Sequence, residues 1–357
     1  MKSSTALIPL SAIYAGVTKA RLAAYRRGWF SVSKLAAPVI SIGNLTTGGT
    51  GKTPLVEWVC RAVASEGGRG TRKKVCVLTR GYGRENPKTQ VVVSDGTQLL
   101  AAERAAGDEP FLLAQNLLGV AAVIANPDRV AAGEWAIEHL QTEVFVLDDG
   151  FQHLRLARDL DIVTIDATNP WGGGSLLPYG RLRETRAGLS RADCVVITRT
   201  DQADDLDSTR AEIRKLLGPA PILTSRMVTS SVRRLDDSAD LKTLGSQPVL
   251  GSQPIAAFCG VGNPESFFRH LRHGGCAPVL TRAFADHHQY NQTELDALVE
   301  AARASGADAL MTTAKDAIKL SAFELKLPCY VLEIQISIDD DARLTEIITA
   351  ACQNRKR

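Results

Sequence analysis

The residues of this 357-residue chain that point most directly to chemistry form one short run of glycines and threonines around a lysine. The run consists of Thr46, Thr47, Gly48, Gly49, Thr50, Gly51, Lys52 and Thr53. Glycines let successive backbone N–H groups turn toward one anion, a lysine adds a positive charge for the β- and γ-phosphates, and a threonine hydroxyl can ligate Mg²⁺. The run therefore predicts a phosphate-binding loop, with Thr46 standing where the usual pattern has glycine.

Two adjacent acids form a second group of candidates. Asp148 and Asp149 directly follow the apolar residues 144–147. A carboxylate at the end of a strand beside a phosphate-binding loop can hold Mg²⁺ directly or through water. We therefore expect Asp148 or Asp149 to be a metal ligand. A plain Asp-Asp-Gly turn at the end of the strand is the alternative interpretation.

Two further motifs contain acids whose role the residues alone leave open. Asp108 lies at the expected start of a helix, where acids commonly complement the helix dipole, and that structural interpretation is favoured. Asp286 and His287 are neighbours in the second half of the chain. An acid beside an imidazole can act as a general-base pair, but a histidine in such a place is as often structural.

A glycine-rich loop at residues 169–184 combines apolar side chains with charged ones. Its charged members include Arg181, Arg183 and Glu184, and its apolar members include Leu176 and Tyr179. Such a mixture suits an amphiphilic ligand that has acyl chains and a phosphate. A buried loop with ordinary surface arginines is the alternative.

The elements that must position these residues alternate between strand and helix patterns. Strands are expected at residues 75–79, 90–94, 120–124, 143–147, 161–165 and 194–198, and helices at 52–65, 107–118, 127–140 and 207–217. This alternation predicts an α/β fold of the P-loop NTPase type with a doubly wound, mostly parallel sheet. We expect a P-loop domain at 31–225, a linker at 226–254, and a second, smaller α/β domain at 255–357 that completes the active site.

The second domain is expected to hold strands at 255–259, 308–313 and 329–334, with helices at 264–273, 292–304, 314–320 and 339–352. Seven cysteines are scattered over the chain without the spacing of a metal site. They are expected to be reduced, buried thiols of a cytosolic protein, and a structural zinc site is not expected.

Residues 1–30 contain five cations and no acid, whereas the whole chain has a net charge of only +3, too small to indicate a nucleic-acid partner. Leu10, Ile13 and Val17 fall on one helical face, with Lys19 and Arg26 opposite. Such a helix can lie on an anionic membrane surface, or it can pack on the protein's own core. The apolar run at 6–17 is too short to span a bilayer.

Taken together, these motifs resemble the tetraacyldisaccharide 4′-kinases of lipid A biosynthesis over nearly the whole chain. The resemblance rests on residues 41–54, 78–83, 107–110, 148–153, 176–184, 258–264, 284–288 and 312–317. It implies an enzyme that uses ATP and Mg²⁺ to phosphorylate the 4′-hydroxyl of a tetraacyl glucosamine disaccharide 1-phosphate, giving lipid IVA. It also implies a peripheral protein on the cytoplasmic face of the bacterial inner membrane, docked by its N-terminal helix, with no obligate protein partner.

The resemblance also implies roles for the candidate residues. Lys52 and the loop amides would hold the β- and γ-phosphates, and Thr53 with Asp148 or Asp149 would hold Mg²⁺. Asp108 would be the base toward the sugar hydroxyl, paired with His287 of the second domain. The glycine-rich loop at residues 169–184, which we name the substrate loop after this implied role, would contribute Arg181, Arg183 and Glu184.

Two other classes of protein stay open at this point. The first is a partner-regulated P-loop ATPase or GTPase. Thr47 stands where such ATPases carry a second lysine, which counts against them, and residues 198–201 only faintly resemble a guanine-reading motif. The second is a soluble small-metabolite kinase, for which the acid-free N-terminus would be incidental.

Overall fold

The structure is a computed structural model that describes residues 7–66, 72–236 and 253–354. The chain forms two compact units. The first unit consists of Met1–Arg226 together with Ile336–Arg357, and the second consists of Met227–Gln335. Each unit has its own sheet strands, helices and apolar core.

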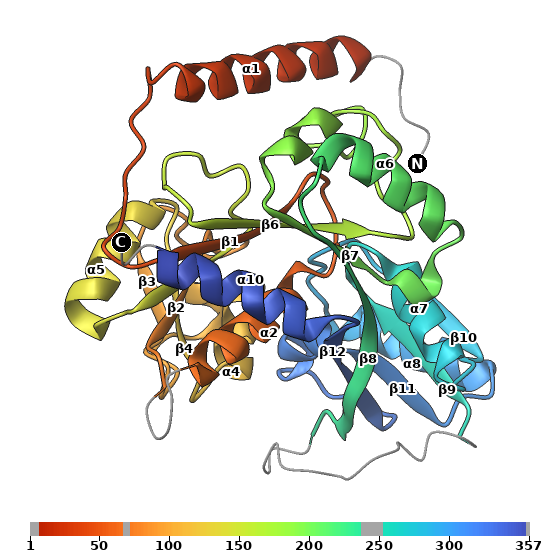
Figure 1. The fold of residues 1–357 in the computed structure, drawn as a ribbon. Helices are drawn as coiled ribbons and strands as arrows, with labels where there is room; N and C mark the ends of the chain where they lie inside the picture. The colour runs from red at the N-terminus through yellow and green to blue at the C-terminus, as the bar shows by residue number, and fades with distance from the viewer. Residues whose placement is uncertain (1–6, 67–71, 237–252, 355–357) are drawn as a thin grey trace. The chain divides into compact units, whose positions relative to one another are not determined.

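The first unit contains a mostly parallel sheet, shown in Figure 1, in the strand order β8-β7-β6-β1-β5-β2-β4-β3. The strands are β1 (Val39–Asn44), β2 (Val75–Thr79), β3 (Val91–Ser94), β4 (Ala121–Ala125), β5 (Val144–Asp148), β6 (Leu160–Asp166), β7 (Cys194–Thr198) and β8 (Ile222–Arg234), of which residues 222–226 belong to this unit. Only the β3–β4 pair is antiparallel among the pairs formed by β1 to β8 in the described part of this unit. Every residue of β1, β2 and β5 is buried, as expected for strands with both faces covered.

Helices cover the two faces of this sheet. They include α2 (Lys52–Ser65), α3 (Glu103–Ala106), α4 (Asp108–Asn116), α5 (Arg129–Leu140), α6 (Leu206–Leu217) and α10 (Asp341–Asn354), together with the short 3₁₀ helices η2 (Arg186–Arg191) and η3 (Thr200–Gln202). Phe145 of β5 packs with residues of α5, and Val195 of β7 packs with residues of α6. Neighbouring residues on each strand point to the opposite face, where α2 contacts β1 and β5. The expected doubly wound α/β architecture is confirmed.

Helix α1 (Ile8–Arg26) lies apart from the sheet in Figure 1, where it is drawn in red. Leu10, Ile13 and Val17 are exposed, as a surface-binding face would require. Ala24, in the last turn of the same helix, is instead buried against the protein. Across the described ranges, no helix has both the length and the apolar character needed to cross a bilayer.

The second unit contains four parallel strands in the order β10-β9-β11-β12. They are β9 (Ile255–Cys259), β10 (Leu280–Ala283), β11 (Ala309–Thr313) and β12 (Cys329–Ile338), and their helices are α7 (Pro264–His273), α8 (Gln292–Ala304) and α9 (Ala314–Leu320). Asn263 begins α7 by accepting a hydrogen bond from the Ser266 amide, which is the usual way that a helix is capped.

The units differ from the boundaries expected from the sequence in two places. Strand β8 extends to Arg234 and so occupies the first part of the expected linker, while residues 237–252 lie outside the described residues. Residues Ile336–Arg357 group with the first unit rather than with a domain at 255–357. The reason is that α10 packs against α2 and β1, and Thr349 of α10 donates a hydrogen bond to Glu66.

All seven cysteines are buried and free, as expected. Burial raises the pKa of the Cys76 thiol well above its usual range, so that this group stays protonated at neutral pH.

Candidate active site

The glycine-rich run lies between a strand and a helix. Strand β1 ends at Asn44 and α2 begins at Lys52, so the loop spans the carboxyl edge of the sheet and the positive end of a helix dipole. Gly48 has a φ of 108° and Gly51 a φ of 80°, a backbone conformation that favours glycine. The loop therefore has the strand–loop–helix setting that binding of a nucleotide phosphate needs.

Asp148 is the last residue of β5 and pairs in register with Ile42 of β1, next to the phosphate-binding loop. Its side chain is buried and accepts a hydrogen bond of 2.9 Å from the Thr79 hydroxyl. Burial, with smaller contributions from the negative charges of Glu109 and Asp149, raises the pKa of Asp148 to about 6.

Asp149 has the opposite environment. Its Oδ1 lies 3.6 Å from the Lys52 ammonium, and its Oδ2 accepts a hydrogen bond of 2.5 Å from Arg183. Burial opposes ionisation here too, but the two cations hold the pKa of Asp149 below its ordinary value. Asp149 thus joins the phosphate-binding loop to the substrate loop, and its φ of 55° is one that few residues other than glycine adopt.

The oxygen atoms at this edge of the sheet fit Mg²⁺. Thr53 lies in the first turn of α2, Asp148 is the last residue of β5 and Asp149 follows it, so this edge of the sheet carries one hydroxyl and two carboxylates. Mg²⁺ prefers such oxygen ligands and usually takes one or two carboxylates together with substrate phosphates. Among the residues that the structure describes, no cluster of three or more His, Cys, Asp or Glu side chains could hold a metal alone. Because the phosphates of a nucleotide supply further oxygen ligands, Mg²⁺ is expected to bind here together with a nucleotide.

The substrate loop is hydrogen-bonded to the phosphate-binding loop. The Thr47 amide donates to the Arg181 carbonyl at 2.8 Å, and the Arg183 amide donates to the Leu45 carbonyl at 2.7 Å. Glu184 accepts hydrogen bonds from Arg191 at 2.7 Å and from Gln152 at 2.9 Å. All three residues expected to bind substrate therefore belong to a segment that borders the phosphate-binding loop.

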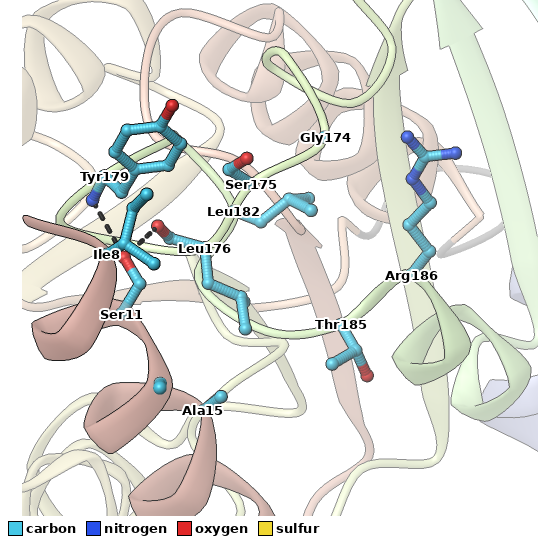
Figure 2. A pocket seen from close by; sticks show the side chains of 11 residues that line it. Ile8, Ser11, Ala15, Gly174, Ser175, Leu176, Tyr179, Leu182, Thr185 and Arg186 are labelled. Carbon is cyan, nitrogen blue, oxygen red and sulfur yellow. Dashed lines mark hydrogen bonds between the residues drawn. The ribbon is translucent and has the colours of Figure 1, made fainter. Parts of the chain in front are cut away.

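A pocket of about 560 Å³ lies between α1 and the substrate loop (Figure 2). It is lined by Ile8, Ser11, Ala12, Ala15, Gly174, Ser175, Leu176, Tyr179, Leu182, Thr185 and Arg186. The Ser11 hydroxyl donates to the Leu176 carbonyl at 2.9 Å and accepts from the Tyr179 amide at 3.0 Å. Most of the lining is apolar, and Arg186 supplies a positive charge, so the pocket can accept a ligand that is partly hydrocarbon.

Asp108 is the first residue of α4 and is buried. The preceding Gly107 has a φ of 88°, and a Cβ at this position would lie 2.4 Å from the Tyr82 carbonyl oxygen. Only glycine fits there without moving the backbone. The negative charge of Glu109, the next residue, contributes to raising the pKa of Asp148 at the end of β5.

His287 belongs to the second unit, whereas Asp108 belongs to the first. The His287 amide donates to the Gly260 carbonyl at 3.2 Å, and its φ is 59°. Its Nε2 lies 3.2 Å from the Lys315 ammonium, which can only donate. Nε2 is therefore the acceptor in this hydrogen bond.

Sequence reasoning missed several residues of these sites. Thr79 is the last residue of β2 and lies at the carboxyl edge of the sheet. Ligands bind at the carboxyl ends of parallel strands, so a polar residue at the end of an expected strand was a usable signal. Gln152 and Lys315 lie inside the motifs at residues 148–153 and 312–317, but the sequence indicates no role for either side chain. Arg129 had no sequence signal, because an arginine at a helix start is usually exposed. Here it is buried, and desolvation lowers its pKa to about 10.

Fold and site together define a P-loop phosphotransferase. Comparison with known proteins then gives the family: residues 3–353 match the family described as LpxK, tetraacyldisaccharide-1-P 4′-kinase, and the chain belongs to it. It is 37% identical over 348 residues to a tetraacyldisaccharide 4′-kinase of Desulfotalea psychrophila, covering 96% of this chain and 95% of that protein. It is 41% identical over 345 residues to the kinase of Geobacter metallireducens, covering 96% of both.

A crystal structure of LpxK from Aquifex aeolicus in complex with ATP is also similar. Its TM-score is 0.74 at 29% identity, with 98% of this chain and 99% of that chain covered. The expected resemblance is thus confirmed, and a lipid-sugar kinase is favoured over both alternative classes.

Proposed function

We propose that this chain transfers the γ-phosphoryl group of ATP to the 4′-hydroxyl of a tetraacyl glucosamine disaccharide 1-phosphate, giving lipid IVA. Membership of the family supports the reaction. Two contacts made by Asp149 are the structural observation on which the proposal mainly rests. Asp149 contacts Lys52 of the phosphate-binding loop and Arg183 of the substrate loop, and so links the part that would hold ATP to the part that would hold the sugar.

In this proposal the loop amides and Lys52 hold the β- and γ-phosphates, and Thr53 with Asp148 or Asp149 holds Mg²⁺. The metal, when bound, neutralises negative charge on the phosphates. Phosphoryl transfer needs little covalent help from the protein, so positioning and charge neutralisation account for most of the catalysis. The phosphate-binding loop can provide both positioning and charge neutralisation, because it is held between β1 and α2.

Asp108 is proposed as the general base. Its carboxylate takes the proton of the 4′-hydroxyl, the freed oxygen bonds to the γ-phosphorus, and the bond to the β–γ bridging oxygen breaks, so that ADP leaves. His287 of the second unit is proposed to assist Asp108.

The lipid substrate is proposed to meet the substrate loop and the pocket beside α1. Arg181 and Arg183 would contact the phosphorylated disaccharide, because guanidinium groups donate several hydrogen bonds to phosphate and sugar oxygens. The Glu184 carboxylate would accept hydrogen bonds from sugar hydroxyls. The apolar lining, which includes Ile8, Leu176 and other side chains, would contact acyl chains.

The proposed location is the cytoplasmic face of the bacterial inner membrane, with α1 docked on its anionic surface. Ile13 and Val17 of α1 are 63% and 61% exposed, an unfavourable state for aliphatic side chains in water. The acid-free sequence around them adds attraction to anionic lipid. A membrane-bound lipid substrate supports the same location.

The test follows labelled phosphate from γ-³²P-ATP to the disaccharide lipid in detergent micelles. Asp108→Asn should lower kcat by about 10²- to 10⁴-fold, the usual contribution of a general base, and should leave the Kd for ATP nearly unchanged. Asp205→Asn is the matched control. Asp205 is also at the start of a helix, where it caps α6, and asparagine caps a helix equally well. Asp205→Asn should therefore keep full activity. A near-normal kcat for Asp108→Asn would remove the base assignment, and absence of lipid phosphorylation by the unmodified protein would remove the proposed reaction.

A further inference from the structure

The end of β7 holds residues that the proposed function does not use. Residues 198–201 begin at Thr198, the last residue of β7, and faintly resemble a guanine-reading motif. In the structure, the first two of them contact the backbone of the phosphate-binding loop. The Thr198 hydroxyl donates to the Thr50 carbonyl at 2.9 Å, and the Arg199 guanidinium donates to the Gly49 carbonyl at 2.7 Å. Two consecutive carbonyl groups of the loop are thus held by two consecutive side chains.

Arg199 is itself fixed by a buried ion pair. Its Nη1 also donates to Asp166, the last residue of β6, at 2.5 Å, and the two side chains are only 11% and 7% exposed. Arg199 has a φ of 56°, which costs a residue other than glycine conformational energy. The ends of two neighbouring strands therefore place this guanidinium under the loop.

Because the peptide unit is planar, holding the carbonyl group of one residue also fixes the direction of the N–H group of the next residue. In a trans peptide the C=O of one residue and the N–H of the next point in opposite directions. With the Gly49 and Thr50 carbonyls held toward β7, the N–H groups of Thr50 and Gly51 point away from it. Glycine at 48, 49 and 51 would otherwise allow these peptide planes to rotate.

We propose that Arg199, fixed by Asp166 and assisted by Thr198, is a positioning residue that sets the amides of the phosphate-binding loop before nucleotide arrives. The inference rests on the proposed function only in taking this loop as the site for the phosphates of ATP. A loop set in advance binds its ligand more tightly, because less conformational freedom is lost on binding.

Two variants separate this role from a simple effect of charge. Asp166→Asn keeps the Oδ1 that accepts from Thr168 and removes a negative charge near the phosphates. An effect of charge alone would strengthen ATP binding, whereas loss of positioning weakens it. Thr198→Val removes one hydroxyl, changes no charge and suits a strand, so only the positioning role predicts weaker binding.

The measurement is the Kd of the full-length protein for ATP and ADP by isothermal titration calorimetry. We expect Asp166→Asn to weaken both nucleotides by about 10-fold or more, and Thr198→Val by a smaller factor, as for a lost hydrogen bond to a charged or neutral group. In the kinase assay, the KM for ATP should rise with little change in the KM for lipid.

Asp161→Asn is the matched control. Asp161 forms a pair with Arg158 near the other end of the same strand, at 2.9 Å and with side chains 12% and 9% exposed. This variant should lower thermal stability but leave both Kd values unchanged. Unchanged or tighter ATP binding by Asp166→Asn, or an equal loss in the Asp161→Asn control, would overturn the proposal. If the unmodified protein bound ATP but phosphorylated no lipid, the proposed function would be wrong. The Kd values for ATP and ADP would still decide whether Arg199 positions the loop.

Discussion

At the scale of single residues, Asp148 and Asp149 show how the surroundings of a carboxylate set its pKa. Asp148 is held in the sheet edge, where burial raises its pKa to about 6, while Lys52 and Arg183 keep the pKa of Asp149 low. Asp149 is therefore the firmly ionised member of the pair. Asp148 is ionised at neutral pH at a cost to the fold, which is expected of a group kept for function rather than stability.

This cost gives a prediction for Asp148→Asn. Because the pKa rises from 3.8 to about 6 on folding, the ionised carboxylate destabilises the fold above pH 6, and the penalty disappears below pH 4. At pH 8 the variant should be more stable, by a free energy of unfolding on the order of 3 kcal/mol at most, and at pH 4 the gain should vanish. Its kcat should fall because a proposed metal ligand is lost.

Urea denaturation without Mg²⁺ at the two pH values measures this difference, and labelled-phosphate transfer measures kcat. Lower stability of Asp148→Asn at pH 8 than at pH 4, relative to the unmodified protein, would show that burial does not disfavour this charge. Retained kcat would show that Asp149 alone serves the metal.

At the scale of elements, α1 has two surfaces with separate proposed tasks. One surface contacts the substrate loop through Ser11 and through Tyr14, whose hydroxyl donates to the Arg183 carbonyl at 2.9 Å. The other presents Ile13 and Val17 to solvent. A helix that only packed on the protein would bury such side chains, and a helix that only met the membrane would not hydrogen-bond to the substrate loop.

We therefore predict that the two surfaces can be impaired separately. Ile13→Asp with Val17→Asp should release the protein from vesicles containing anionic lipid in a sedimentation assay, with activity in detergent micelles largely kept. Ser11→Ala should leave sedimentation unchanged and raise the KM for the lipid up to about 30-fold, since two hydrogen bonds of about 1 kcal/mol each are lost. If both variants changed both measurements alike, α1 would act as one unit.

Elements were predicted well wherever the local signal was strong. The expected strands at 75–79 and 194–198 and helices at 52–65 and 292–304 have the observed bounds, because each is a buried apolar run or an amphipathic run with clear ends. The extension of β8 to Arg234 was not predicted, because its polar, partly exposed residues look like a linker. The pairing of Arg183 with Asp149 depends on how two distant loops fold together, and no local pattern encodes it.

At the scale of the whole molecule, the residues proposed for the chemical step are divided between two units. The phosphate-binding loop, Asp108 and the substrate loop belong to the first unit, and His287 belongs to the second. A sequence motif can mark each residue, but the motif does not say whether two residues act in one step. Coupling between them must therefore be measured as an energy.

A double-mutant cycle makes that measurement. If Asp108 and His287 act together on the sugar hydroxyl, Asp108→Asn combined with His287→Ala should lower kcat by little more than the more damaging single change. If they act independently, the two factors should multiply. His288→Ala is the matched control, because His288 lies next to His287 but stacks on Phe284 and contacts Glu294 within its own unit. Its factor should multiply with that of Asp108→Asn. Multiplying factors for His287→Ala as well would mean that the second unit does not contribute this imidazole to the base, and that Asp108 works without it.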